Sequence, residues 1–234
     1  MKNSERFLST YNKLDHYLKG LDHSDNYRSF SSVLNRLKKS HKVINHYEKK
    51  LKSYNNLRNA IVHERIDGTV IAEPNDYAVS DLNSIYMKIS SPRSILDVCK
   101  HSITKLNHKD SLSTALTVMK ENDFSQLPVY KGDVFVEMLN TETVSSWMAH
   151  NIKQDTVNIQ ETKVSDVLHF KSDYRVTLFQ SRNASIYEIL DLYKDNAYYS
   201  KQIDAIIITH NGKVTEKPIT IITDYDIPIL LENI

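Results

Sequence analysis

The feature that most constrains this sequence is an internal repeat in its second half. Residues 111–122, SLSTALTVMKEN, align without gaps with residues 185–196, SIYEILDLYKDN. Apolar residues coincide at 112/186, 115/189, 116/190 and 118/192, and both segments end in a lysine, an acidic residue and an asparagine. This apolar spacing is typical of one face of a helix. The fold must therefore accommodate two copies of one helix-containing unit.

The segments around the two helices also follow one order. A β-prone piece precedes each helix, and an apolar strand, a glycine turn, a last strand and a further helix follow it. In the first copy these segments are 102–106, Leu127-Pro128-Val129, Lys131-Gly132-Asp133 and 134–139; in the second they are 175–179, 206–209, Asn211-Gly212 and 219–222. Asn-Gly between apolar runs favours a hairpin because both residues tolerate a positive φ. Neither copy can bury its sheet alone, so we expect the two sheets to pack face to face.

The first part of the chain has a helical pattern instead. Four apolar stripes recur at helical spacing: Phe7, Tyr11, Leu14, Leu18 and Leu21; Phe30, Val33, Leu34 and Leu37; Ile44, Tyr47, Leu51, Tyr54 and Ile61; Val79, Leu82, Tyr86 and Ile89. Asp67-Gly68 and Pro74 interrupt the chain before the fourth stripe. Short connections between four amphipathic helices predict an antiparallel bundle.

These patterns together predict an α+β protein with three parts. We expect an all-α helical bundle over residues 1–91, a first β-α-β-β-α repeat over 92–152 and a second over 153–234.

The repeated order of motifs resembles a tandem pair of CBS domains, also called a Bateman module. The first copy carries Leu127-Pro128-Val129 and Gly132, and the second carries Gly212 and the run IITDYD at 221–226. The resemblance covers about residues 93–234 and implies a regulatory module that binds an adenine nucleotide or dinucleotide.

The resemblance assigns the ribose contacts to Thr223 and Asp226. A carboxylate can accept hydrogen bonds from both ribose hydroxyls, and charge-assisted bonds are about twice as strong as neutral ones. A threonine hydroxyl at a helix start can serve a phosphate oxygen. Val176, Ile206 and Ile207 are candidates by position for the contacts to the adenine ring.

The first copy departs from this pattern at the matching stretch, where Asn140 replaces the threonine and Thr143 replaces the aspartate. A single neutral hydroxyl cannot chelate a ribose diol as a carboxylate does. We therefore expect the first site to be weak, empty or specific for something else.

A structural role for Thr223 and Asp226 is the alternative. Thr-x-x-acid before an apolar run resembles a helix capping box. With Thr223 as N-cap, Pro228 would fall at the fifth helical position and remove a backbone hydrogen bond. With Asp226 as N-cap, the proline is harmless, but the carboxylate then serves the helix.

The third helical segment ends in Leu57-Arg58-Asn59-Ala60-Ile61-Val62-His63. This is similar to the R-x4-6-H motif of HEPN domains, helical bundles of which many cut RNA without a metal. The resemblance implies catalytic roles for Arg58, Asn59 and His63: a histidine can act as general acid or base, and an arginine can grip a phosphate. Five residues apart on a helix, Arg58 and His63 lie about 140° apart in rotation, so we expect a turn or a second copy to bring them together.

Two other interpretations of that segment stay open. Arg58 and Asn59 can form an internal polar network while His63 ends the helix, where a cation is favoured. The bundle is then a degenerate HEPN-like interaction module or unrelated to HEPN domains.

Composition excludes several classes of protein. The chain has one cysteine and no apolar run long enough to cross a bilayer, so we expect no disulfide, no cysteine metal cluster and a cytoplasmic location. Histidines such as His41 and His46 have no carboxylate or cysteine partners at metal-ligand spacing, so we expect no metal site. Residues 1–70 hold 14 Lys+Arg against 7 Asp+Glu, and the remainder holds 16 against 22. A basic first part favours either solvated helix faces or a surface for a polyanion such as RNA.

The leading functional hypothesis is a ligand-sensing protein, in which an adenine nucleotide binds the CBS pair and alters the helical bundle. The nucleotide is a regulatory ligand, and no cofactor is required. The expected assembly is a homodimer. The alternative is an enzyme, a HEPN-like ribonuclease gated by the CBS pair. A third hypothesis is a scaffold whose bundle only dimerises.

Overall fold

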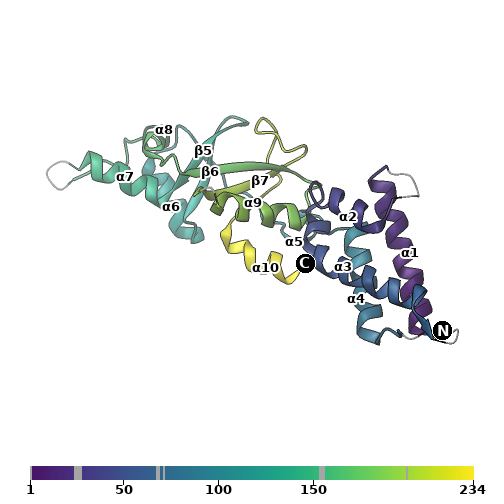
Figure 1. Ribbon diagram of the computed structural model, residues 1–234. Helices are drawn as coiled ribbons and strands as arrows, with labels where there is room; N and C mark the ends of the chain where they lie inside the picture. Colours follow the sequence, from purple (N-terminus) through teal and green to yellow (C-terminus); the bar gives the residue numbers. More distant parts are fainter. Residues whose placement is uncertain (1, 24–27, 67–68, 71, 153–155, 199) are drawn as a thin grey trace. The chain divides into compact units, whose positions relative to one another are not determined.

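The computed structural model describes residues 2–23, 28–66, 69–70, 72–152, 156–198 and 200–234. It divides into two compact units, Met1–Arg93 and Ser94–Ile234 (Figure 1). The expected end of the bundle at residue 91 lies close to this division.

The first unit contains the four helices that the apolar stripes predicted. They are α1 (Asn3–Leu21), α2 (Phe30–Leu37), α3 (Lys42–His63) and α4 (Asp76–Ser90). Side-chain caps start two of them: Ser29 accepts a hydrogen bond from the Ser32 amide, and Asn75 accepts one from the Ala78 amide. A short antiparallel ribbon of β1 (Arg65–Ile66) and β2 (Thr69–Val70) precedes α4. The Asp67-Gly68 interruption lies outside the described residues.

The stripes form the core of this unit. Most of their members are buried, and Leu21, Tyr54 and Tyr86 are partly exposed; the buried set is Phe7, Tyr11, Leu14, Leu18, Phe30, Val33, Leu34, Leu37, Ile44, Tyr47, Leu51, Ile61, Val79, Leu82 and Ile89. Among the described residues, every helix is too short or too polar to span a membrane.

The second unit contains the predicted duplication. Its first half has α5 (Ile95–Val98), β3 (Leu106–Asn107), α6 (Leu112–Asn122), β4 (Gln126–Lys131), β5 (Val134–Asn140) and α7 (Thr141–Asn151). Its second half has α8 (Val164–Val167), the 3-10 turn η1 (Leu168–Phe170), β6 (Arg175–Ser181), α9 (Ile186–Tyr198), β7 (Gln202–Thr209), β8 (Thr220–Ile222), the 3-10 turn η2 (Asp224–Asp226) and α10 (Ile227–Glu232). The expected strand at 102–106 is shorter and later, because only Leu106 and Asn107 pair with β4.

The two sheets have the same topology. The order is β3-β4-β5 in the first and β6-β7-β8 in the second. In each sheet the first strand is parallel to the central strand, and the last strand is antiparallel to it. Helices α6 and α9 provide the crossover connection that each parallel pair needs. The α+β class and the order of elements are confirmed.

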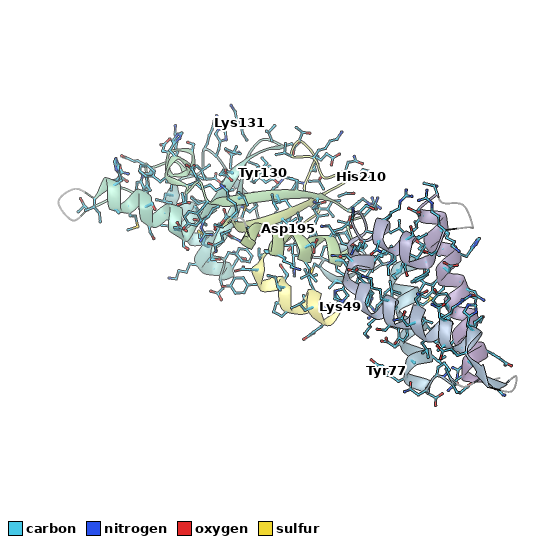
Figure 2. All side chains as sticks on the ribbon, in the orientation of Figure 1. Lys49, Tyr77, Tyr130, Lys131, Asp195 and His210 are labelled. Atoms are coloured by element: carbon cyan, nitrogen blue, oxygen red, sulfur yellow. The ribbon has the colours of Figure 1, made fainter. Side chains whose placement is uncertain are left out.

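The two turns after the central strands differ in length. In the first repeat, Lys131 leads directly into Gly132, whose φ is 64°. In the second repeat, residues 210–219 join β7 to β8, and Gly212 has a φ of 79°. Both glycines supply the left-handed backbone that the turns require. Figure 2 labels Lys131 and His210, where the two connections begin.

Each repeat pairs with the segment that leads into the other repeat. We call these the lead-in segments: residues 94–101 before the first repeat and residues 156–163 before the second. The Ile95 amide donates to the carbonyl of Ala184, 2.8 Å away, and Ser94 bridges to Ser185. In the same way, Ser111 bridges to Lys163. Ser111 and Ser185 are paired positions in the sequence repeat, so the structure is pseudo-symmetric. The segment before the first repeat therefore completes the second repeat.

The two sheets face each other, as the sequence predicted. The ring of Phe135 on β5 meets that of Phe179 on β6 edge to face, with centroids 5.2 Å apart. The Gln126 side-chain amide of β4 donates to the carbonyl oxygen of Asp204 on β7. One core cluster of the first repeat also includes Val164 and Val167 of α8.

Candidate functional site

Thr223 and Asp226 lie where β8 ends and the last helix begins. The Asp226 carboxylate is mostly buried, and its oxygen Oδ2 accepts from the Thr223 amide at 2.7 Å and from the Thr223 hydroxyl at 3.2 Å. These contacts form a capping box around the 3-10 turn η2. One oxygen of the carboxylate is thus used by the chain itself, as the structural alternative anticipated.

The position of Pro228 explains how both helical turns coexist. The 3-10 turn η2 takes Thr223 as its N-cap, and α10 begins only after Asp226, with the proline in its first turn. A proline there removes no helical hydrogen bond. The Asp226 side chain makes no capping bond to α10.

The second oxygen of Asp226 contacts a residue from the lead-in segment. Oδ1 lies 2.7 Å from Nε2 of His101, whose side chain is 53% exposed. The backbone of His101 is fixed by Thr220, because its amide donates to Thr220 Oγ1 at 3.0 Å and its carbonyl accepts from that hydroxyl at 3.1 Å. The backbone of His101 is therefore fixed, while about half of its side chain is exposed to solvent.

The buried thiol of Cys99 completes this cluster. One ligand atom from each of Cys99, His101 and Asp226 lies within 4.8 Å of the other two. Burial, with a further contribution from the charge of Asp226, raises the pKa of the Cys99 thiol to about 11. Burial first, and then Asp224, Asp226 and Cys99, raise the pKa of the nearby Tyr193 phenol.

The three apolar candidates are placed unequally. Ile206 pairs with Ile222, the residue before Thr223, and Ile207 pairs with Ile221. The side chains of Ile206 and Ile207 are fully buried in the protein core. Val176 is partly exposed on β6 and pairs with Ile203, toward the end of the sheet where β8 runs into η2. Its side chain is the more accessible of the three.

The matching position of the first repeat is closed by the protein's own side chains. Asn140 caps α7 by accepting from the Thr143 amide at 2.8 Å and from its hydroxyl at 2.9 Å, and both residues are buried. The Asn140 side-chain amide donates to Asp204 at 3.0 Å. Polar groups of this capping turn are therefore satisfied inside the protein.

Two cations of the second repeat, Arg175 and Lys171, form ion pairs close to this capping turn. Arg175 lies 2.7 Å from Asp204 and 2.5 Å from Glu142, and Lys171 lies 2.7 Å from Glu137. Burial acts to lower the pKa of Arg175, but the bonds to Asp204 and Glu142 raise it overall. Bonds from Tyr174 and Arg175 hold the pKa of Glu142 below its usual value.

In the first unit, Arg58, Asn59 and His63 come together at the end of α3. An Nη1 nitrogen of Arg58 lies 3.2 Å from Nε2 of His63 and donates to Asn59 Oδ1 at 3.2 Å. The expectation that a turn or a second copy must bring the arginine and histidine together was wrong. The long, flexible arginine side chain spans the rotation between the two positions.

Arg58 and Asn59 also line a cavity of about 340 Å³ in this unit. Its lining contains three cations, two aromatic rings, two amides, an acid and two hydroxyls: Lys19, Arg28, Arg58, Tyr11, Phe30, Asn55, Asn59, Asp15, Ser29 and Ser31. The guanidinium of Arg58 stands over the Tyr11 ring, 5.9 Å from its centroid. The Tyr11 hydroxyl donates to Asn55 at 2.6 Å, and burial first, then Asp15, raise its pKa.

Sequence reasoning missed Cys99 and His101. Residues two positions apart on an extended segment, such as Cys99 and His101, share a side. This weak local signal gives no information about an aspartate 125 residues beyond His101. Only the crossing of the lead-in segment into the second repeat brings the three side chains together.

Comparison with known proteins gives matches among solved structures only. No family model and no curated protein matches the sequence. A CBS-domain containing protein from Agrobacterium tumefaciens matches with a TM-score of 0.42 and 10% identity, over 60% of this chain and 98% of that chain.

Two matched structures contain ligands. The protein CbpB in complex with c-di-AMP matches with a TM-score of 0.44 and 11% identity, over 60% of this chain and 85% of that chain. The CBS domain pair of protein MJ0100, in complex with 5′-methylthioadenosine and S-adenosyl-L-methionine, has a TM-score of 0.43 and 12% identity, over 60% of this chain and 97% of that chain.

Proposed function

We propose that residues 94–234, a CBS pair by the duplicated order of its elements, sense an adenine nucleotide or dinucleotide beside Thr223 and Asp226 and transmit its binding to the helical bundle. The observation that carries the proposal is the arrangement of the Asp226 carboxylate. One oxygen is oriented by Thr223, and the other is engaged by the exposed imidazole of His101.

Displacement of His101 would free an oriented carboxylate oxygen for a sugar hydroxyl. The capping contacts to Thr223 need not break, because they use the other oxygen. A charge-assisted bond to the ribose would replace the contact to the imidazole. Matched structures that contain adenine compounds support the choice of ligand class.

The proposal is tested by thermal unfolding of the metal-free full chain with adenosine, AMP, ADP, ATP, S-adenosylmethionine and cyclic di-AMP. A ligand at 100 times its dissociation constant should stabilise the protein by about 2.7 kcal/mol. The variant Asp226→Asn should lose this shift. The control is Asp224→Asn, which removes the same charge from an exposed neighbour and should keep it.

A flat response to the whole panel would contradict the proposal. So would an equal shift in wild type and Asp226→Asn, because the ligand would then bind elsewhere.

A second candidate function rests on the first unit. We infer from the contact between Arg58 and His63, beside a cavity lined by cations and aromatic rings, that the bundle is suited to act as a metal-independent ribonuclease. In such a reaction His63 would take the proton of a ribose 2′-hydroxyl, and Arg58 would hold the scissile phosphate.

This candidate is tested by incubating the full chain with total RNA in excess EDTA, beside His63→Ala and Arg58→Ala. Cleavage by the wild type that both variants reduce at least about 100-fold would support it, since general acid–base catalysis contributes roughly 10²–10⁴-fold. The surface variant His16→Ala is the control for loss of a histidine. Equal cleavage by wild type and His63→Ala, or no cleavage at all, would exclude it.

A further inference from the structure

The cluster of Cys99, His101 and Asp226 combines three side chains that ligate transition metals. The candidate ligand atoms, a thiol sulfur, an imidazole nitrogen and a carboxylate oxygen, lie within 4.8 Å of one another. In a tetrahedral zinc site the nitrogen and oxygen ligands are about 3.3 Å apart, given metal–ligand distances near 2.0–2.2 Å. Nε2 of His101 and Oδ1 of Asp226 are now 2.7 Å apart, so they need only separate slightly to admit an ion.

The surroundings of the cluster fix two of the three candidate ligands, Asp226 and His101. Thr223 holds Oδ2 of Asp226 and so turns Oδ1 toward the histidine. Thr220 holds the backbone of His101 through two hydrogen bonds. Partners of this kind orient the ligands in known metal sites, and their removal typically lowers metal affinity roughly 10–100-fold.

The chemistry of the three donors selects the ion. A thiolate and an imidazole favour Zn²⁺ over Mg²⁺ or Ca²⁺, which prefer oxygen ligands throughout. Binding displaces the thiol proton of Cys99, because a coordinating thiol is deprotonated even where burial opposes ionisation. Three protein ligands leave a fourth tetrahedral position, which the exposed side of His101 leaves accessible to water or an anion.

We propose that Cys99, His101 and Asp226 bind one zinc ion, which ties the lead-in segment to the start of α10. The exchange of bonds and protons is balanced: the Cys99 thiol releases its proton to solvent, and the Nε2 proton that His101 donates to the Asp226 carboxylate moves through solvent to Nδ1. The His101–Asp226 contact is then replaced by a bond from each residue to the metal. This proposal does not depend on nucleotide binding.

The test uses the tag-free, metal-free full chain titrated with Zn²⁺ and, separately, with Co²⁺ as a spectroscopic probe. Cys99 is the only cysteine of the chain, so a thiolate-to-cobalt charge-transfer band reports on this residue alone. We expect that band at one Co²⁺ per chain, intense visible bands of tetrahedral Co²⁺, and reversal of both by one equivalent of Zn²⁺.

Single substitutions distinguish metal binding at the proposed site from metal binding by other histidines of the chain. His101→Ala removes an exposed side chain and should lower Zn²⁺ affinity at least about 100-fold, beyond the loss typical of an outer partner. Cys99→Ser should abolish the charge-transfer band. His169→Ala, an exposed histidine of the same unit, should leave both unchanged.

Absence of the charge-transfer band in the wild type would overturn the proposal. Zn²⁺ affinity that His101→Ala leaves within about twofold of wild type would overturn it too. The titration contains no nucleotide, so a flat nucleotide panel with an intact cobalt signal would refute only the sensor function, and the reverse result would refute only the zinc site.

Discussion

The two repeats have the same strand order but treat the start of their last helix in opposite ways. In the first repeat, the capping turn of Asn140 and Thr143 is buried and bonded to Asp204 of the second repeat. In the second repeat, the turn of Thr223 and Asp226 meets a single exposed histidine. One turn is closed by a buried network, and the other is covered by a half-exposed side chain.

This difference shows that two repeats with the same strand order can place very different polar groups at the start of the last helix. Where the second turn has the charged Asp226, the first turn has the neutral Thr143. Arg175 and Lys171 of the second repeat bring ion pairs to the same region. The weakness of the first site remains a prediction, and this network gives its physical reason.

The largest expected effect on stability comes from breaking the ion pair between Arg175 and Asp204 beside the first repeat. Arg175→Met leaves the fully buried carboxylate of Asp204 without its nearest cation. Breaking a buried ion pair on one side typically costs about 3–5 kcal/mol, and we expect a loss of that size in urea denaturation. Lys217→Met, which removes one partner of a 4.0 Å pair that is 81% and 67% exposed, should leave stability unchanged. Similar losses from both variants would mean that the network does not close the first repeat.

The turns after the central strands give the next effect. Gly132→Ala places an L side chain at a φ of 64° in open space and should cost about 1–2 kcal/mol. Gly212→Ala has the same backbone strain, and its Cβ would lie 3.0 Å from the Ser181 amide nitrogen, so we expect more than about 2 kcal/mol. The comparison is made by urea midpoint. A smaller loss at Gly212 than at Gly132 would show that the longer connection relaxes around the substitution.

The smallest effect concerns the long connection of the second repeat. Bonds from the backbone and side-chain amides of Asn211 lower the pKa of Glu216 from 4.5 to about 2. Its ionised form therefore stabilises the folded state above pH 4.5, and this contribution disappears as the pH falls toward about 2. Glu216→Gln should have a lower melting temperature than wild type near pH 6 and the same one near pH 2. A gap that persists unchanged at acid pH would contradict this assignment.

Local patterns in the sequence predicted most of the fold. The four helices, the duplicated order of elements and the glycine turns depend on residues within one segment, and periodicity or positive φ reveals them. The exchange of lead-in segments between repeats has no local signal. It depends on bonds such as that from Ile95 to Ala184, which only the packed fold creates.

Local patterns in the sequence also indicated part of the candidate site. Thr223 and Asp226 could be chosen from a motif, and Pro228 indicated where the last helix begins. The engagement of Asp226 by His101, and the nearness of Cys99, could not be foreseen because these residues are far apart in the chain. The separation of Arg58 and His63 was also predicted wrongly, because the angle between their positions on the helix does not include the reach of the arginine side chain.

The central claim is that Asp226 offers a displaceable oxygen to a nucleotide. Calorimetric titration of the metal-free wild type and of His101→Ala, with the adenine compound that gives the largest thermal shift, tests it most directly. If the imidazole competes for Oδ1, its removal should tighten binding by up to about tenfold, or about 1.4 kcal/mol. An affinity that His101→Ala leaves unchanged or weakens would contradict the account.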